Sequence, residues 1–274
     1  MISTRNINYL KVLPGAWLGV TLALLMPCSI ASAADAAAAA PAAAPAPPPP
    51  PPETKEWVTS AAAALTLTRG NSENFLVTLT LDTKRKWERD ELGFGVSGGY
   101  GDSTVNNQNT KNTEFLQGYG QYNHLFTYRF YAGLRLDGQY DGIAGVDYRV
   151  KITPLAGYYL IKQEKMHLSV EAGPSVVFEH LSGEDPTTYA AIRFSETFDY
   201  NLTATTKIWE TLSYIPQIDE WTKNYLLNFE AGIDTSITKK LSLRVVFQDM
   251  YASQPAPGKK DNDMRLLAGV AYKF

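Results

Sequence analysis

The sequence predicts an all-β protein, a closed antiparallel transmembrane β-barrel of about twelve strands with an N-terminal signal peptide and an Ala/Pro linker. Two observations indicate this fold class. From residue 57 to the end, long runs of side chains alternate between apolar and polar with a period of two, as expected for strands with lipid on one face. Before residue 57, a short apolar segment is followed by a stretch of Ala and Pro, which is typical of an exported chain with a spacer.

The gross composition excludes other classes of protein. The 274 residues carry a formal net charge of −3, so there is no electrostatic case for binding nucleic acid. After position 33, no apolar run reaches the length of about 20 residues that a membrane-spanning helix needs. A helical membrane protein is therefore excluded.

Residues 1–33 have the three parts of a secretory signal peptide. Arg5 and Lys11 supply positive charge, residues 17–26 (WLGVTLALLM) form an apolar core, and small residues end at Ala33. This order is what the export machinery and signal peptidase recognise. We expect passage through the Sec translocon and cleavage at or near Ala33.

Two alternatives to cleavage are a retained anchor and a lipidated cysteine. The apolar core is short for an anchor, and Cys28 follows Pro27, which is a poor match to a lipoprotein cleavage site. Because Cys28 is the sole cysteine of the chain, cleavage after it leaves a mature protein without a disulfide or a catalytic thiol.

Residues 34–56 form the predicted linker, which includes the six consecutive prolines 47–52. Proline fixes φ and lacks a backbone donor, so an extended polyproline II segment without a core is expected in the periplasm. At full extension the linker could reach about 70 Å. It could be a plain spacer or a tether towards the cell wall.

Residues 57–274 form the predicted outer-membrane barrel. In the run 166–179, for example, apolar residues at even positions alternate with mostly polar or charged residues at odd ones. Such runs are longer than an ordinary strand of about 5–6 residues and suit a tilted strand that crosses a bilayer. The predicted strands are 57–68, 74–87, 91–101, 113–126, 128–140, 146–161, 166–179, 188–201, 206–217, 223–237, 241–252 and 262–274.

The connections between these runs alternate in character. One set is tight, as in a barrel's periplasmic turns, and the other is generally longer and more polar, as in its external loops. Residues 69–73 and 141–145 are short members of the second set. The tight set is 88–90, 127, 162–165, 202–205 and 238–240; the longer set is 102–112, 180–187, 218–222 and 253–261.

Aromatic residues gather at both ends of the predicted strands. Two belts of rings, one at each interface, are what amphipathic aromatic side chains form in a bilayer. The periplasmic belt is predicted to hold Trp57, Trp87, Phe126, Tyr128, Tyr200, Trp209 and Phe274, and the external belt Tyr100, Tyr140, Tyr148, Tyr189, Tyr225 and Tyr251.

Several short motifs resemble a known family. They are residues 65–72 (LTLTRGNS), 79–87 (LTLDTKRKW), 249–255 (DMYASQP), Asp261 and the terminal Tyr272-Lys273-Phe274. In order and spacing, over residues 57–274, the chain resembles the family called domain of unknown function 481. Its members are described as salt-induced outer-membrane proteins, so the resemblance implies a barrel in the bacterial outer membrane. It implies no catalytic residues.

The last strand carries a candidate assembly signal. Apolar residues recur at two-residue steps up to a terminal aromatic, namely Leu266, Ala268, Val270, Tyr272 and Phe274. An unpaired strand edge of this kind can be presented to the barrel-assembly machinery. The same pattern is also expected of any lipid-facing strand, and both interpretations can hold together.

The polar faces of the strands place charges of both signs in the lumen. Six basic and seven acidic positions nearly balance, which fits either a cross-strand salt-bridge network or an ion-filled channel. Glu196 and Glu210 fall on the nominal lipid face, so a bulge or a misassignment is expected there. The predicted lumen charges are Arg135, Asp137, Asp147, Arg149, Lys151, Glu171, Glu179, Arg193, Asp199, Glu230, Asp234, Arg244 and Arg265.

The sequence predicts no enzyme, cofactor or metal site. His180, Ser182 and Asp185 are close in sequence, but a triad requires a base hydrogen-bonded to its nucleophile. We expect a monomeric barrel among outer-membrane lipid and lipopolysaccharide, either structural or a narrow, weakly ion-selective pore. The alternative is a surface barrel that binds a ligand or lipid through its external loops, with Trp221 and Tyr251.

Overall fold

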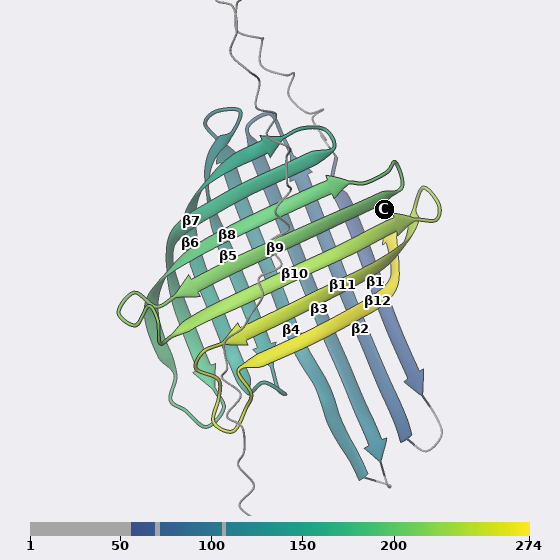
Figure 1. Cartoon of the computed structure of the whole chain (residues 1–274), viewed down its shortest axis with the longest axis vertical. Coiled ribbons are helices and arrows are strands. Elements are labelled where there is room, and N and C mark those ends of the chain that lie inside the picture. Colours follow the sequence, from purple (N-terminus) through teal and green to yellow (C-terminus); the bar gives the residue numbers. More distant parts are fainter. Residues whose placement is uncertain (1–55, 69–71, 106–107) are drawn as a thin grey trace, which may run out of the picture. The chain divides into compact units, whose positions relative to one another are not determined.

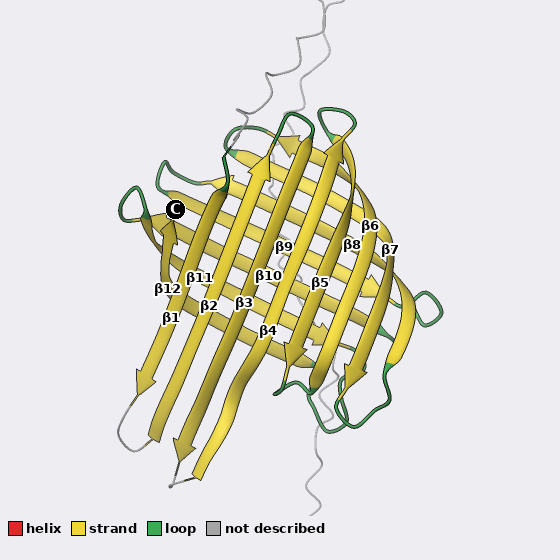
Figure 2. Ribbon diagram, turned by 180° about the vertical axis from the view of Figure 1, so that it is seen from behind, coloured by secondary structure: helices red, strands yellow, loops and turns green. Residues whose placement is uncertain are grey.

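The computed structural model describes residues 56–68, 72–105 and 108–274. The predictions for the signal peptide and for residues 34–55 of the linker lie outside the described residues. Within the described part, twelve antiparallel strands close into a barrel (Figures 1 and 2). They are β1 Val58–Thr68, β2 Ser72–Lys86, β3 Asp90–Val105, β4 Gln108–Leu125, β5 Phe130–Asp141, β6 Val146–Lys162, β7 Met166–Leu181, β8 Thr187–Asn201, β9 Thr206–Pro216, β10 Tyr225–Ser236, β11 Leu241–Ala252 and β12 Asn262–Lys273.

The predicted fold class is confirmed, since each strand pairs with its sequence neighbours and β1 pairs with β12. The main difference concerns the predicted loop 102–112. There β3 continues to Val105 and β4 already starts at Gln108, with a bulge between Gly101 and Asp102. This hairpin is polar on both faces, so it lacks the alternation that marks a strand. It extends beyond most other strands at the external end (Figure 2).

The seam between β1 and β12 is short. Ser60–Ala63 pair with Val270–Lys273, and the Phe274 N–H donates a hydrogen bond of 3.0 Å to the Thr59 carbonyl. Just beyond this pairing, a Cβ on Gly269 would lie 2.3 Å from the Ala63 carbonyl oxygen. Glycine is therefore required at this close approach of the two strands.

The outer surface is an apolar belt, as the alternation predicts. On β12, for instance, Leu266 is 68% and Val270 43% exposed, whereas Ala271, which faces inward, is 0% exposed. A closed barrel leaves no sheet edge in lipid, and an apolar exterior matches the bilayer. The chain is accordingly an outer-membrane barrel.

Two aromatic assignments are wrong. Trp209 points into the lumen, where its Nε1 donates a 2.9 Å hydrogen bond to Glu230, and Tyr189 packs inside beside Val177 and Ala191. The opposite face of β9 carries Glu210. The indole N–H of Trp209 has a carboxylate acceptor, so the side chain can lie in a wet lumen. The position of Trp209 at a strand end therefore does not indicate which face of the sheet it occupies.

Neither of the two explanations expected for Glu196 and Glu210, a bulge or a misassigned face, is found. The β8–β9 register runs without a shift over the described residues, and both carboxylates lie on the outer face. A bulge is instead present at the start of β6, between Val146 and Tyr148. It removes Asp147 from the lumen and places it beside His180 and Ser182, at 3.4 Å and 2.6 Å.

Candidate pore and its ion-pair networks

The barrel encloses a cavity of about 860 Å³, which side chains from each of the twelve described strands line. At the periplasmic end the lining includes Lys86 and Lys207, close to the ends of their strands. At the external end it includes Gln139 and Met250. The cavity thus follows the barrel over most of its height.

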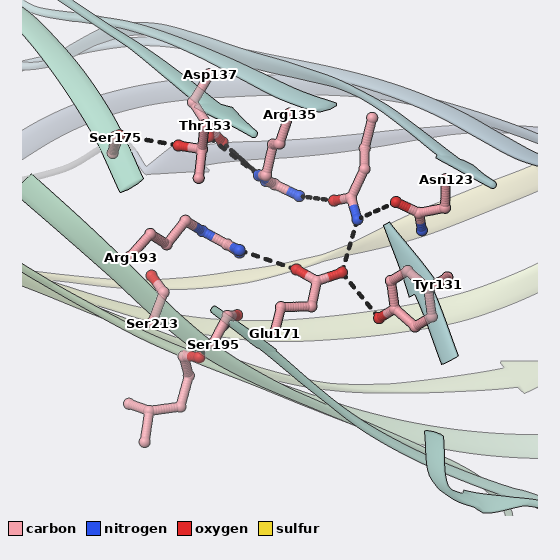
Figure 3. A network of polar contacts seen from close by, with 12 residues as sticks. Asn123, Tyr131, Arg135, Asp137, Thr153, Glu171, Ser175, Arg193, Ser195 and Ser213 are labelled. Carbon is pink, nitrogen blue, oxygen red and sulfur yellow. Dashed lines mark hydrogen bonds and ion pairs between the residues drawn. The ribbon is translucent and has the colours of Figure 1, made fainter. Parts of the chain in front are cut away.

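One network of polar contacts centres on Glu171 of β7 (Figure 3). Its carboxylate accepts hydrogen bonds from Gln121 at 2.7 Å, Tyr131 at 3.0 Å and Arg193 at 2.8 Å. Because these partners lie on β4, β5 and β8, a single carboxylate ties together the wall from β4 to β8. A buried carboxylate with three donors is well satisfied.

The guanidinium of Arg135 extends this network. It donates to Asp137 at 2.8–3.0 Å and to Gln121 at 2.8 Å, and it stacks 4.6 Å from the ring centre of Tyr119. Each interaction uses a different part of the guanidinium, so the side chain is held in one position. The β4–β8 wall therefore carries fixed charges of both signs.

A second network lies on the wall from β9 to β11. Arg244 binds Asp234 at 2.9 Å, with Asp82 of β2 at 3.9 Å. Glu230 accepts hydrogen bonds from Trp209 at 2.9 Å and Gln248 at 2.8 Å. The contact from β11 to β2 crosses the short β1–β12 seam and reinforces it.

Buried ion pairs occupy the external end. Arg149 pairs with Glu179, and Arg265 pairs with Asp141 while its guanidinium lies 4.0 Å from the ring centre of Phe115. Asp141 is only 2% exposed and also accepts hydrogen bonds from the backbone N–H groups of the β5–β6 turn. Contacts here narrow the mouth of the cavity.

The remaining predicted residues are placed as follows. Nine of the predicted lumen charges line the cavity, among them Lys151 and Asp199. Arg149, Glu179 and Arg265 form the ion pairs of the external end, and Asp147 is the exception noted above. The candidate assembly residues Leu266, Ala268, Val270, Tyr272 and Phe274 share the outer face of β12. Among the described residues, no group of three or more possible metal ligands is found.

Trp221 and Tyr251, the residues of the surface-binding alternative, belong to a ladder of rings on the outer face. Phe194, Trp221, Tyr214, Tyr225 and Tyr251 follow one another with centroid distances of 6.0, 6.4, 5.6 and 5.6 Å. Rings in this place meet the lipid interface.

Sequence reasoning missed charged residues of the cavity, above all lysines at the periplasmic strand ends. Lys84, Lys86, Lys165, Lys207 and Lys273 line it. The run 79–87 held a signal for two of them, since Lys84 and Lys86 share parity with Asp82 on the inner face of β2.

Comparison with known proteins identifies the family. The family model described as "Protein of unknown function, DUF481" matches residues 61–274. The chain belongs to the DUF481 family. The resemblance in the sequence motifs is thereby confirmed for almost the whole barrel. A comparison with curated proteins found no significant match to this DUF481 chain.

Three solved structures similar to the DUF481 barrel are two porins and the translocator domain of an autotransporter. The NanC porin has 6% identity and a TM-score of 0.45, covering 79% of this chain and 96% of the porin. The KdgM porin has 10% identity and a TM-score of 0.41, covering 80% and 99%. The translocator domain of autotransporter NalP from Neisseria meningitidis has 14% identity and a TM-score of 0.41, covering 80% and 87%. These likenesses concern the barrel fold alone.

Proposed function

We propose that this DUF481 barrel is a narrow, weakly ion-selective pore of the outer membrane. One observation carries the proposal: the cavity of about 860 Å³ runs from lysines at the periplasmic end to Gln139 and Met250 near the external end. A barrel plugged by its own side chains would leave no continuous cavity along its length. Here most of the lining residues are polar or charged.

Weak selectivity is supported by the middle of the cavity, where charges of both signs interleave. Arg135, Lys151, Arg193 and Arg244 face Asp82, Asp137, Glu171 and Glu230. A ring of one sign is what makes a channel strongly selective. Alternating signs at this level give the pore no strong preference for cations or for anions. The long arginine side chains also narrow the pore.

Conductance of the purified, folded protein in planar bilayers tests the pore. We expect a small single-channel conductance that rises in Arg135→Ala and in Arg193→Ala, because each change removes a side chain that narrows the cavity. Arg129→Ala is the matched control, since Arg129 is exposed in the β4–β5 turn. Heat-modifiable mobility confirms that each variant folds. Absence of current in wild type and variants would overturn the pore and favour a structural barrel.

A second candidate function is lipid binding at the external rim, which the ring ladder that includes Trp221 favours. Aromatic side chains at this level contact acyl chains and headgroups together. Lipopolysaccharide should then raise the unfolding temperature of wild type more than that of Trp221→Ala. An equal rise in both proteins would refute the role of the ladder.

A further inference from the structure

The periplasmic end of the cavity is lined by five lysines, which we call the lysine vestibule: Lys84, Lys86, Lys165, Lys207 and Lys273. They come from β2, the β6–β7 turn, β9 and β12, and each lies within a few residues of a periplasmic strand end. The vestibule therefore lies at the periplasmic end of the cavity, next to its charge-balanced middle.

Carboxylates offset this vestibule only in part. Lys86 pairs with Glu91 at 3.2 Å, Lys207 with Asp199 at 2.5 Å and Lys273 with Asp234 at 3.7 Å. Asp234 is shared, because Arg244 holds it at 2.9 Å. Lys84 and Lys165 have no carboxylate within 4.0 Å in the described part of the chain.

The charge of the lining departs from that of the chain as a whole. Apart from Arg85, which lies against the outer rings of Trp57 and Trp87, nine of the described lining residues are basic and seven acidic, so the lining carries 9 − 7 = +2. The whole chain has a net charge of −3. Since the middle of the cavity is balanced, the positive excess belongs to the vestibule, and composition alone does not explain it.

Small residues of β1 leave room between two of the lysines. In the sheet register, Val58 is opposite Lys84 of β2, and Ser60 is opposite Lys273 of β12. Ser60 and Ala62 also line the cavity. The ammonium groups of Lys84 and Lys273 therefore flank this strip together with the Asp82 carboxylate, which is the β2 partner of Ser60. A compact anion with several charges has the two lysines as partners here.

We propose that the lysine vestibule binds compact multivalent anions, phosphate or carboxylate in chemistry, and gives the pore a preference for anions. This inference rests on the proposed pore function. A net positive mouth raises the local concentration of anions. Added salt weakens this effect, because dissolved ions screen the lysine charges. At physiological ionic strength the Debye length is about 8 Å.

The reversal potential across a KCl gradient and block by sodium tripolyphosphate test this inference. For wild type we expect chloride permeability about two- to fivefold above that of potassium at low salt. The variant Lys84→Gln/Lys207→Gln/Lys273→Gln should bring this ratio close to one and raise the half-blocking tripolyphosphate concentration about tenfold, as expected when several charged contacts are lost.

The matched control is Arg89→Gln/Lys239→Gln/Lys240→Gln. It removes the same charge from periplasmic turns, where the three side chains are exposed and do not line the cavity. Its permeability ratio should equal that of wild type. Equal shifts in both triple variants would overturn the vestibule, since net charge alone would then explain the result.

The two proposals fail in distinguishable ways. Wild-type current without anion preference would overturn the vestibule and leave the pore intact. If wild type passes no current, the pore proposal fails, and calorimetric titration of the folded protein with tripolyphosphate decides on the vestibule. Binding to wild type and not to the vestibule variant supports the site; no binding to wild type overturns it.

Discussion

Arg265, on the inner face of β12, forms an ion pair with Asp141 at the end of β5, 124 positions earlier in the chain. Between these two strands the sheet order places β1, β2, β3 and β4, so the pair joins walls that are not neighbours. At the same end, Ala256 of the β11–β12 loop packs against Val146 and Leu181. Contacts between separate walls thus close part of the external mouth.

Replacing Asp141 with Ala should lower the free energy of unfolding by about 3–5 kcal/mol, because it leaves the Arg265 guanidinium without its partner. Asp141→Asn should lower the free energy of unfolding by less, since the amide oxygen can still accept hydrogen bonds from the N–H groups of Ile143 and Ala144. Urea titration of the refolded protein in detergent measures both values. Equal losses would show that the turn contributes nothing beyond the ion pair.

The Arg265–Asp141 pair also shows what the sequence could not predict. Alternation identifies the strands and the face of most residues, because it follows directly from the pleat and from lipid on one side. The alternation predicts that Arg265 faces the lumen, whereas Asp141 falls in a predicted turn. Which residues meet across a lumen depends on the cross-section of the barrel, and that depends on the packing of the whole interior.

Local exceptions to the alternation were equally hidden. The bulge at the start of β6 reverses the face of Asp147, and a bulge adds one residue without a sequence signal of its own. In the sequence, Gly269 is an ordinary position on the lumen face. In the structure, the Ala63 carbonyl approaches so closely that only glycine fits there. Alternation alone does not place the periplasmic lysines in the cavity, because charges near strand ends are usually solvated at the rim.

Adjacent valines on β11 test the assignment of faces. Val245 is 38% exposed on the outer surface, whereas Val246 lines the cavity. Val245→Arg should destabilise the folded barrel in lipid vesicles by about 2–4 kcal/mol, because it places a charge near the middle of the bilayer. Val246→Arg should cost clearly less, as water reaches its side chain. Similar costs at the two positions would contradict the assigned register.

A disulfide across the seam tests the closure of the barrel. Ala62 and Ala271 are register partners on β1 and β12, and directly opposed residues of antiparallel strands lie about 4.5–5.5 Å apart, which suits a disulfide. Ala62→Cys/Ala271→Cys should therefore crosslink under mild oxidation. Mobility on non-reducing gels after boiling should increase, because the linked chain cannot fully extend.

The matched control for the seam is Ala62→Cys/Val246→Cys. Both positions line the cavity, but β1 and β11 are not paired in the sheet. This variant should not crosslink appreciably. Equally efficient crosslinking in the two double variants would mean that the β1–β12 register is misassigned.

The last prediction separates an assembly signal from an aromatic belt. Phe274 is 74% exposed at the end of β12 and packs edge-on against Tyr272, with ring centres 5.1 Å apart. Phe126 is 59% exposed in the β4–β5 turn at the same end of the barrel. Both rings meet the same interface, but only Phe274 ends the strand that closes the sheet. If the assembly machinery recognises that strand, Phe274→Ser should reduce the heat-modifiable barrel in the outer membrane severalfold, while Phe126→Ser should not.

Deletion of Phe274 should reduce the amount of folded barrel more than Phe274→Ser does. The deletion also removes the backbone N–H that donates to the Thr59 carbonyl at 3.0 Å. Quantitative blots of folded and unfolded forms, normalised to total synthesis, measure the three variants together. Equal yields from Phe274→Ser and Phe126→Ser would assign Phe274 to the belt alone. A defect confined to the deletion would assign the effect to the backbone bond of the seam, since the serine variant retains that N–H and loses only the ring.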